Sequence, residues 1–174
     1  MSNALKVASM AILTSCVVHA QTTPRPGPSE PSAAHEKLRF FEGTWTTSDS
    51  NPDQAFRESC AWLPEGRRHM VCRSRWRTAT GPREGMSIFS YDATTREYVY
   101  NGFRAGGTYV TLRGTEENGR WVLQSESGKG AERVRNRVTI EPNRQGGFNF
   151  LSEASTDDAP WKEQAEIAYI RVAQ

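Results

Sequence analysis

The alternation of apolar and polar side chains is clearest in residues 56–77, where it predicts a β-hairpin. If the chain turns about Gly66, Cys60 lies opposite Cys72 and Trp62 lies opposite Met70. In the second half of this segment the even positions are largely apolar, whereas positions 73, 75 and 77 are all arginine. A period of two is typical of a strand with one buried and one solvated face. The hairpin therefore defines a core-facing side that can be followed into the neighbouring strands.

Similar runs recur about every ten residues and predict a meander of antiparallel strands. Gly, Pro, Asn and Asp separate them, as at Asn118-Gly119. Closure of the first strand on the last removes the exposed sheet edges, so we expect an all-β barrel of about ten strands rather than an open sandwich. A short helix over residues 33–41, with Ser32 as its N-cap, precedes it. The predicted strands span residues 44–48, 55–63, 69–77, 85–91, 97–103, 108–113, 120–126, 133–141, 148–154 and 161–172.

The inward face of the hairpin can be carried from strand to strand through the predicted turns. The inward set is then Met86, Ile88, Ser90, Tyr98, Tyr100, Gly102, Val110, Leu112, Trp121, Leu123, Val134, Val138, Ile140, Phe148, Phe150 and Ser152. The middle strands also carry a second apolar face that needs a cover. Residues 38–41, a partner subunit in a homodimer or a ligand would provide it. This face consists of Phe89, Tyr91, Val99, Phe103 and Tyr109.

The chain begins with a segment typical of export. Residues 1–20 contain Lys6, an apolar run over 7–18 and a small-x-Ala site ending at Ala20, which predict a signal peptide and a periplasmic or secreted protein. As an alternative, Cys16 would be the lipidated first residue of an anchored lipoprotein. Residues 21–32 contain four prolines and predict a disordered linker, and residues 33–174 form one domain. No later apolar run is long enough for a transmembrane helix.

Cys60 and Cys72 are the cysteines that remain after this cleavage. Opposed positions of an antiparallel pair lie within disulfide range, and an oxidising compartment favours the bond. The alternative is a pair of reduced, buried cysteines. The formal net charge of +2 gives no basis for a nucleic-acid partner.

A family resemblance rests on Gly43-Thr44-Trp45, which follows the short helix and opens the first strand. It resembles the Gly-x-Trp of lipocalin-type (calycin) barrels, and the resemblance implies that Trp45 fills the barrel floor with Arg171 stacked on it. Residues 84–92, 98–100, 106–107 and 161–171 together are similar to a family of uncharacterised secreted bacterial domains, over about residues 35–172. This resemblance implies a fold and no assigned activity. A haem-binding branch of these barrels uses a late histidine, and none follows His69 here.

Glu58 is the candidate residue for chemistry inside the barrel. By the hairpin parity it points inward beside Ser74, where an unpaired carboxylate costs several kcal/mol or becomes protonated. Two alternatives are that it lies in water near the barrel mouth or pairs with an arginine. In the functional interpretation it belongs to the lining of an otherwise aromatic ligand pocket. That predicted pocket consists of Glu58, Ser74, Trp76, Tyr98, Tyr100, Asn136 and Ser152.

The remaining motifs argue against catalysis. His35, expected to be an exposed helix residue, and His69 have no metal-ligand spacing, and there is no Gly-x-Ser-x-Gly elbow. We therefore predict no catalytic residue, metal or cofactor, and an enzyme using Glu58 as general acid or base ranks last. The first hypothesis is non-covalent binding of a small hydrophobic ligand. The alternative is an envelope interaction or structural module with a filled core, working through outer aromatic side chains or the arginine rows 73/75/77 and 133/135/137. A cavity of about 300 Å³ or more would favour the ligand.

Overall fold

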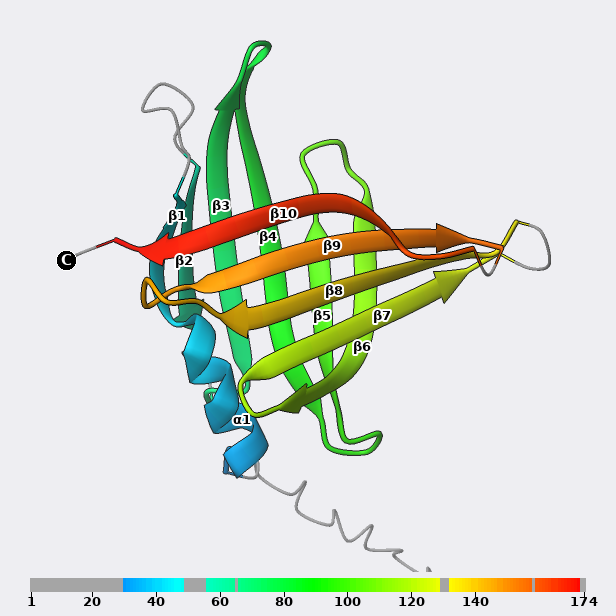
Figure 1. Ribbon diagram of the computed structural model, residues 1–174. Coiled ribbons are helices and arrows are strands. Elements are labelled where there is room, and N and C mark those ends of the chain that lie inside the picture. Colours follow the sequence, from blue (N-terminus) through cyan, green and yellow to red (C-terminus); the bar gives the residue numbers. More distant parts are fainter. Residues whose placement is uncertain (1–29, 49–55, 65, 129–131, 158, 173–174) are drawn as a thin grey trace, which may run out of the picture.

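The alternating segments fold as ten antiparallel strands that close into a barrel, as predicted (Figure 1). The computed structural model describes residues 30–48, 56–64, 66–128, 132–157 and 159–172, so the predicted signal peptide and most of the linker lie outside the described residues. A short helix, α1 (Ala33–Lys37), continues as the 3-10 helix η1 (Leu38–Phe41). The strands are β1 (Gly43–Thr47), β2 (Arg57–Trp62), β3 (His69–Thr78), β4 (Gly81–Asp92), β5 (Glu97–Phe103), β6 (Tyr109–Glu117), β7 (Arg120–Ser127), β8 (Val134–Pro142), β9 (Phe148–Thr156) and β10 (Lys162–Arg171).

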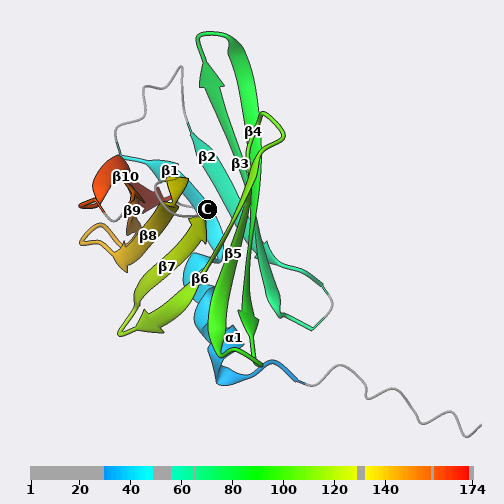
Figure 2. The ribbon, with the colours of Figure 1, turned by 90° about the vertical axis from the view of Figure 1, so that its right-hand side faces the viewer.

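The strands pair in sequence order, and β1 closes the barrel by pairing with both β2 and β10. Strands β7 to β10 cross in front of β3 to β5 in Figure 1. Figure 2 shows α1 at one end of the barrel, between these two groups of strands. The barrel interior is therefore bounded by strands on its sides and by the helical segment at one end.

The opening hairpin has the predicted register. Cys60 pairs with Cys72, and Trp62 pairs with Met70. After the turn at Asn118-Gly119 the inward residues change from even to odd sequence numbers, as predicted, because only these two residues separate β6 from β7. Both residues adopt positive φ, as is usual in a two-residue hairpin turn. The inward face of β5 to β9 follows as expected from the sequence.

Strand β4 corrects one prediction. Its alternating inward residues are Ser87 and Phe89, whereas the sequence predicted Met86, Ile88 and Ser90; of these three, Met86 also lines the barrel cavity. The reason is the tight turn between β3 and β4, in which residues 78 and 81 pair and only two residues intervene. When a turn contains an even number of residues, each even-numbered residue of one strand pairs with an odd-numbered residue of the next, so the inward side chains of the next strand have odd numbers. The β4–β5 turn has four residues and reverses the parity again.

The helical segment plugs one end of the barrel. Leu38 and Phe41 are almost completely buried, and the Phe41 ring stacks on Phe89 with centroids 4.1 Å apart. The indole Nε1 of Trp45 donates a hydrogen bond to the Phe41 carbonyl over 2.8 Å. Apolar packing and one satisfied buried donor thus fix η1 against the first strand.

His35 is buried, and the expectation of an exposed helix residue is wrong. Its Nδ1 accepts a hydrogen bond from the backbone N–H of Ser32 over 3.1 Å, which satisfies a donor at the helix start. The imidazole also contacts the Tyr91 ring edge-on, 5.6 Å between centroids. Burial is the largest cause that lowers the pKa of His35. Its role in the described structure is capping and packing.

The predicted second apolar face is divided in the folded chain. Phe89 and Tyr91 pack toward the helical segment, whereas the side chains of Phe103 and Tyr109 stay on the surface, 42% and 75% exposed. Within the part of the chain that the structure describes, no helix is long and apolar enough to cross a membrane.

Candidate functional site

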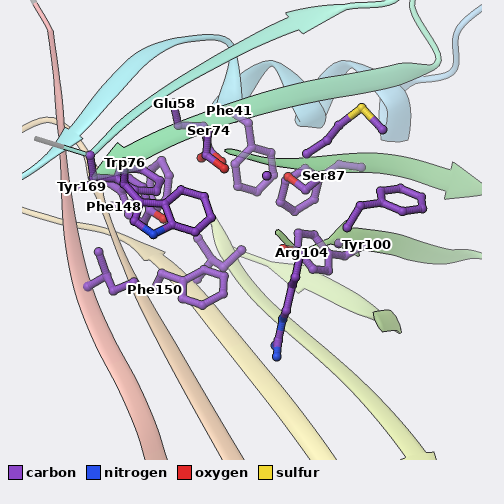
Figure 3. Close-up of a pocket in the computed structure, with 18 of the residues that line it drawn as sticks. Phe41, Glu58, Ser74, Trp76, Ser87, Tyr100, Arg104, Phe148, Phe150 and Tyr169 are labelled. Carbon is purple, nitrogen blue, oxygen red and sulfur yellow. The ribbon is translucent and has the colours of Figure 1, made fainter. Parts of the chain in front are cut away.

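A cavity of about 650 Å³ lies inside the barrel. It extends from Phe41 at the plugged end to the β3–β4 turn and the end of β5. Its wall is mainly apolar, and most of its large side chains are aromatic (Figure 3). Volume and lining are those of a small-molecule site. The aromatic residues of the wall are Phe41, Phe56, Trp76, Phe89, Tyr100, Phe148, Phe150 and Tyr169, and the exposed Phe103 lies at its solvent end.

Four of the predicted pocket residues line this cavity. Glu58 and Ser74 are cross-strand neighbours, and Trp76 and Tyr100 supply aromatic rings. Figure 3 shows Glu58 and Ser74 close together beside the rings of the cavity. The opening hairpin therefore positions three of these four side chains, because β2 and β3 present alternate residues to the same interior.

The other three predicted pocket residues lie at different heights of the barrel. The Tyr98 hydroxyl donates a hydrogen bond to the Ala34 carbonyl over 3.1 Å, beside the helical plug. Asn136 lies opposite Ser125 on β7, and Ser152 lies opposite Val138. None of the three is among the residues that line the cavity. Alternation determines which face of a strand a residue occupies, but not how far along the barrel it lies.

Several lining residues were missed in the sequence. Ser87 and Phe89 were assigned to the outer face because the β3–β4 turn was expected to keep parity. A two-residue turn at Ala79-Thr80 would have given their correct orientation. Ile167 on β10 also lines the cavity and follows from its pairing with Phe150, which was correctly placed inward.

Two glycines give the cavity its shape. A Cβ atom on Gly102 would approach the Tyr100 ring and hydroxyl to 2.8 Å, so the glycine lets the tyrosine ring lie against the strand. A Cβ atom on Gly85 would lie 2.8 Å from the Ser74 hydroxyl and 3.3 Å from the Trp76 ring. The backbone of β4 and β5 thus forms part of the cavity wall, as it does where glycine permits close approach.

Glu58 is the acidic residue of this cavity. Its neighbours across the sheet are Trp45 on β1 and Ser74 on β3. Burial raises the pKa of Glu58 to about 7, because the surrounding protein disfavours the charged form. Burial also raises the pKa of Tyr100 to about 12 and that of Tyr169 well above its usual value, and the charge of Glu58 adds to both shifts. Among the described residues we find no hydrogen-bond donor to the carboxylate.

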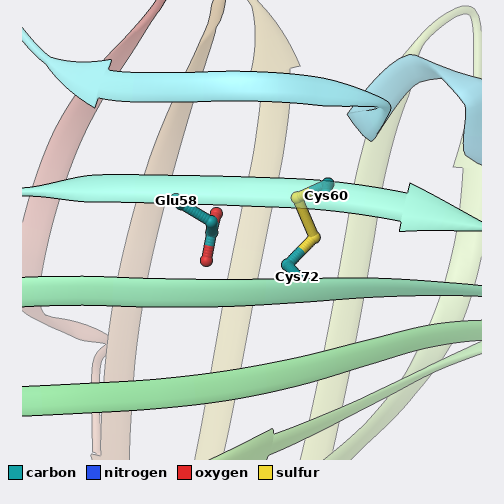
Figure 4. Close-up of side chains that lie close together, drawn as sticks. All are labelled: Glu58, Cys60 and Cys72. Atoms are coloured by element: carbon teal, nitrogen blue, oxygen red, sulfur yellow. A yellow bond between two sulfur atoms is a disulfide. The ribbon is translucent and has the colours of Figure 1, made fainter.

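The disulfide predicted between Cys60 and Cys72 is formed and lies next to Glu58 (Figure 4). The two sulfur atoms and a Glu58 oxygen lie within 4.8 Å of one another. A metal site would need thiolates here, and these sulfurs are bonded to each other. The chemistry left at this point is a single carboxylate beside an apolar cross-link.

The mouth of the cavity has a different character. Arg77 and Arg104 line it and are exposed to solvent. Figure 3 shows the Arg104 side chain extending away from Glu58 and Ser74. The cavity is therefore acidic at depth and basic at its solvent end.

Trp45 and Arg171 form the contact that the family resemblance implies for the barrel floor. Trp45 is 2% exposed, and the Arg171 guanidinium carbon lies 4.5 Å from the centroid of its ring. Arg171 also donates a hydrogen bond to the Glu42 carbonyl over 3.0 Å. A cation–π contact and a backbone hydrogen bond thus join the first and last strands. The chain matches no family model and no curated protein.

Proposed function

We propose that this protein is an exported, lipocalin-like barrel that binds a small hydrophobic molecule non-covalently. The observation that carries the proposal is the cavity of about 650 Å³ with its aromatic wall. Such a volume lies within the range of about 300–1,000 Å³ of small-molecule sites. It also argues against the alternative of a completely filled core.

The fold class and the compartment rest on separate observations. The stacked Trp45 and Arg171 support the resemblance to lipocalin-type barrels. The Cys60–Cys72 disulfide supports a periplasmic or secreted location, since such bonds persist in oxidising compartments. Native mass spectrometry of protein purified from its own host is the direct test, because a retained mass identifies the ligand. Protein that repeatedly carries no extra mass and binds no apolar probe would contradict the proposal.

Partly filling the cavity should weaken ligand binding without unfolding the barrel. Ile167 lines the cavity on β10, and we expect Ile167→Trp to weaken binding of the neutral fluorophore N-phenyl-1-naphthylamine at least about tenfold, because the indole would occupy ligand space. Ile170→Trp is the matched control: it makes the same change on the same strand, at a position that does not line the cavity. Fluorescence titration measures both. Equal affinities of the two variants would place the binding site elsewhere.

A second candidate function uses the outer surface of β2 to β6. On this surface Arg57 faces Arg75 across the sheet, and the exposed Phe103 and Tyr109 are paired on β5 and β6. Arg75 also forms an ion pair with Glu84 over 2.9 Å, and in the other arginine row Arg137 forms a two-bond ion pair with Glu153. Exposed arginines with neighbouring aromatic rings favour an anionic envelope surface as partner.

Vesicle sedimentation tests this second candidate. We expect binding to vesicles rich in phosphatidylglycerol at low ionic strength and its loss at about 1 M salt, where the screening length falls to about 3 Å. Vesicles of phosphatidylcholine alone are the control for charge. Binding that does not depend on salt or on the anionic lipid would contradict this function.

A further inference from the structure

The side chains of the cavity also indicate which charged group its ligand contains, an inference that rests on the proposed function. The Glu58 side chain is only partly exposed to solvent in a mainly apolar cavity, and no described residue donates a hydrogen bond to its carboxylate. Removing an ionised group from water without a partner is costly, so a ligand that supplies a partner for the carboxylate would be favoured at this position. The disulfide beside it leaves no thiolate to share a metal.

Aromatic rings line the cavity to one side of this carboxylate, as Figure 3 shows for Trp76, Phe148 and Tyr169. Phe56 packs at 6.2 Å from Trp76 and at 5.5 Å from Tyr169, and Tyr169 stacks on Phe148 at 4.5 Å between centroids. All four rings line the same cavity. The faces of aromatic rings attract cations, and cages of such rings recognise quaternary ammonium groups.

We propose that the ligand is an amphipathic organic cation whose ammonium group lies against Glu58 within the rings of Phe56, Trp76, Phe148 and Tyr169. The carboxylate attracts the positive charge of the ligand, and the ring faces contact its ammonium group. A metal ion or a strongly hydrated cation would interact less favourably with these ring faces. A neutral alcohol could donate a hydrogen bond to Glu58, but it would leave the buried charge uncompensated. A ligand with an anionic buried end would be repelled.

The other titratable groups near the cavity are consistent with a ligand whose cationic end lies at Glu58. Tyr100 from β5 and Tyr169 from β10 face Glu58 as neutral phenols in the physiological range, since the pKa of both is raised. Arg77 and Arg104 lie at the solvent-exposed mouth, where water and salt screen their charges. They are placed to contact a polar or anionic outer end of the ligand.

Three ten-carbon probes separate the contributions: decyltrimethylammonium, decanol and decanoate. At pH 8, where the Glu58 carboxylate is ionised, we expect calorimetry to give at least about tenfold tighter binding of the cation than of decanol, with decanoate weakest. In Glu58→Gln this preference should shrink to about twofold or less, while decanol affinity stays within about threefold. Decanol binding by the variant shows that the cavity remains folded. Glu84→Gln, which removes a carboxylate from the exposed face of β4, is the matched control and should keep the full preference.

The outcomes distinguish this inference from the function on which it rests. If the wild-type protein binds decanol and the cation equally, or if the preference survives Glu58→Gln, the organic-cation inference is wrong and the hydrophobic cavity stands. Tightest binding of decanoate would assign recognition to the mouth arginines and would overturn the inference as well. If none of the three probes binds, both the inference and the proposed function are contradicted.

Discussion

Replacing Cys60 and Cys72 together with alanine is expected to lower the free energy of unfolding by about 3 kcal/mol. The bond joins residues separated by 12 positions and restricts the unfolded chain, while both cysteines are almost completely buried in the folded barrel. It also joins the two strands that position Glu58, Ser74 and Trp76. Urea denaturation followed by tryptophan fluorescence should show a transition midpoint lower by more than about 1 M.

The wild-type protein in reducing agent provides the control for this substitution. It retains both sulfur atoms, so its loss of stability isolates the cross-link from the packing of the side chains. If oxidised wild type and the double variant unfold at the same urea midpoint, the bond contributes nothing to stability. A titration that finds two reactive thiols in the denatured protein purified from its host would show that the bond does not form in the cell.

The stability of the ligand-free protein should fall as the pH rises from about 4.5 to 7, because of Glu58. Its pKa is raised from 4.5 to about 7 in the folded state, so in this window the folded protein holds a proton that the unfolded chain has released. Stability therefore decreases with pH, and it levels off above the folded pKa. At 1.36 kcal/mol per pKa unit the decrease is about 3 kcal/mol.

Other groups titrate with the opposite sign and need a matched comparison. Hydrogen bonds from Arg113 and Arg137 lower the pKa of Asp92 and Glu153, so their contribution is lost as the pH falls below about 4. Burial lowers the pKa of His35, whose contribution is lost as the pH falls below its unfolded value near 6.5. The contributions of these other groups are the same in wild type and in Glu58→Gln, so they cancel when the two free energies of unfolding are subtracted.

Urea unfolding at a series of pH values measures this difference. Glu58→Gln should be more stable than wild type at pH 8 and should lose that advantage near pH 4.5, while Glu84→Gln should follow the wild-type curve. A wild-type curve that parallels Glu58→Gln throughout would mean that the carboxyl group titrates normally and is hydrated. A bound organic cation should also reduce the decline, because it favours the ionised carboxylate in the folded state.

The outcome for individual residues shows which features of the structure a strand pattern can predict. The pairing of Cys60 with Cys72 and the position of Glu58 beside Ser74 followed from one hairpin, because a symmetric turn determines every pair in it. Ser87 and Phe89 were missed because a single two-residue turn reverses the parity of a whole strand. Tyr98 was correctly predicted to face inward, yet it lies beside the helical plug and bonds to Ala34.

The sequence alone predicted the all-β class, a barrel of about ten strands, the short helix, the pairing of Cys60 with Cys72 and an inward Glu58, and the structure decided between barrel and sandwich and showed the disulfide bond. The predicted features depend on local periodicity and on pairing across turns, which are written in the order of residues along the chain. Only the tertiary structure decided that the interior holds a cavity, and that Glu58 lies within it among Phe56, Trp76 and Tyr169. Side chains from strands far apart in sequence enclose that space, and whether they meet or leave a void depends on the height and tilt of each strand in the closed barrel.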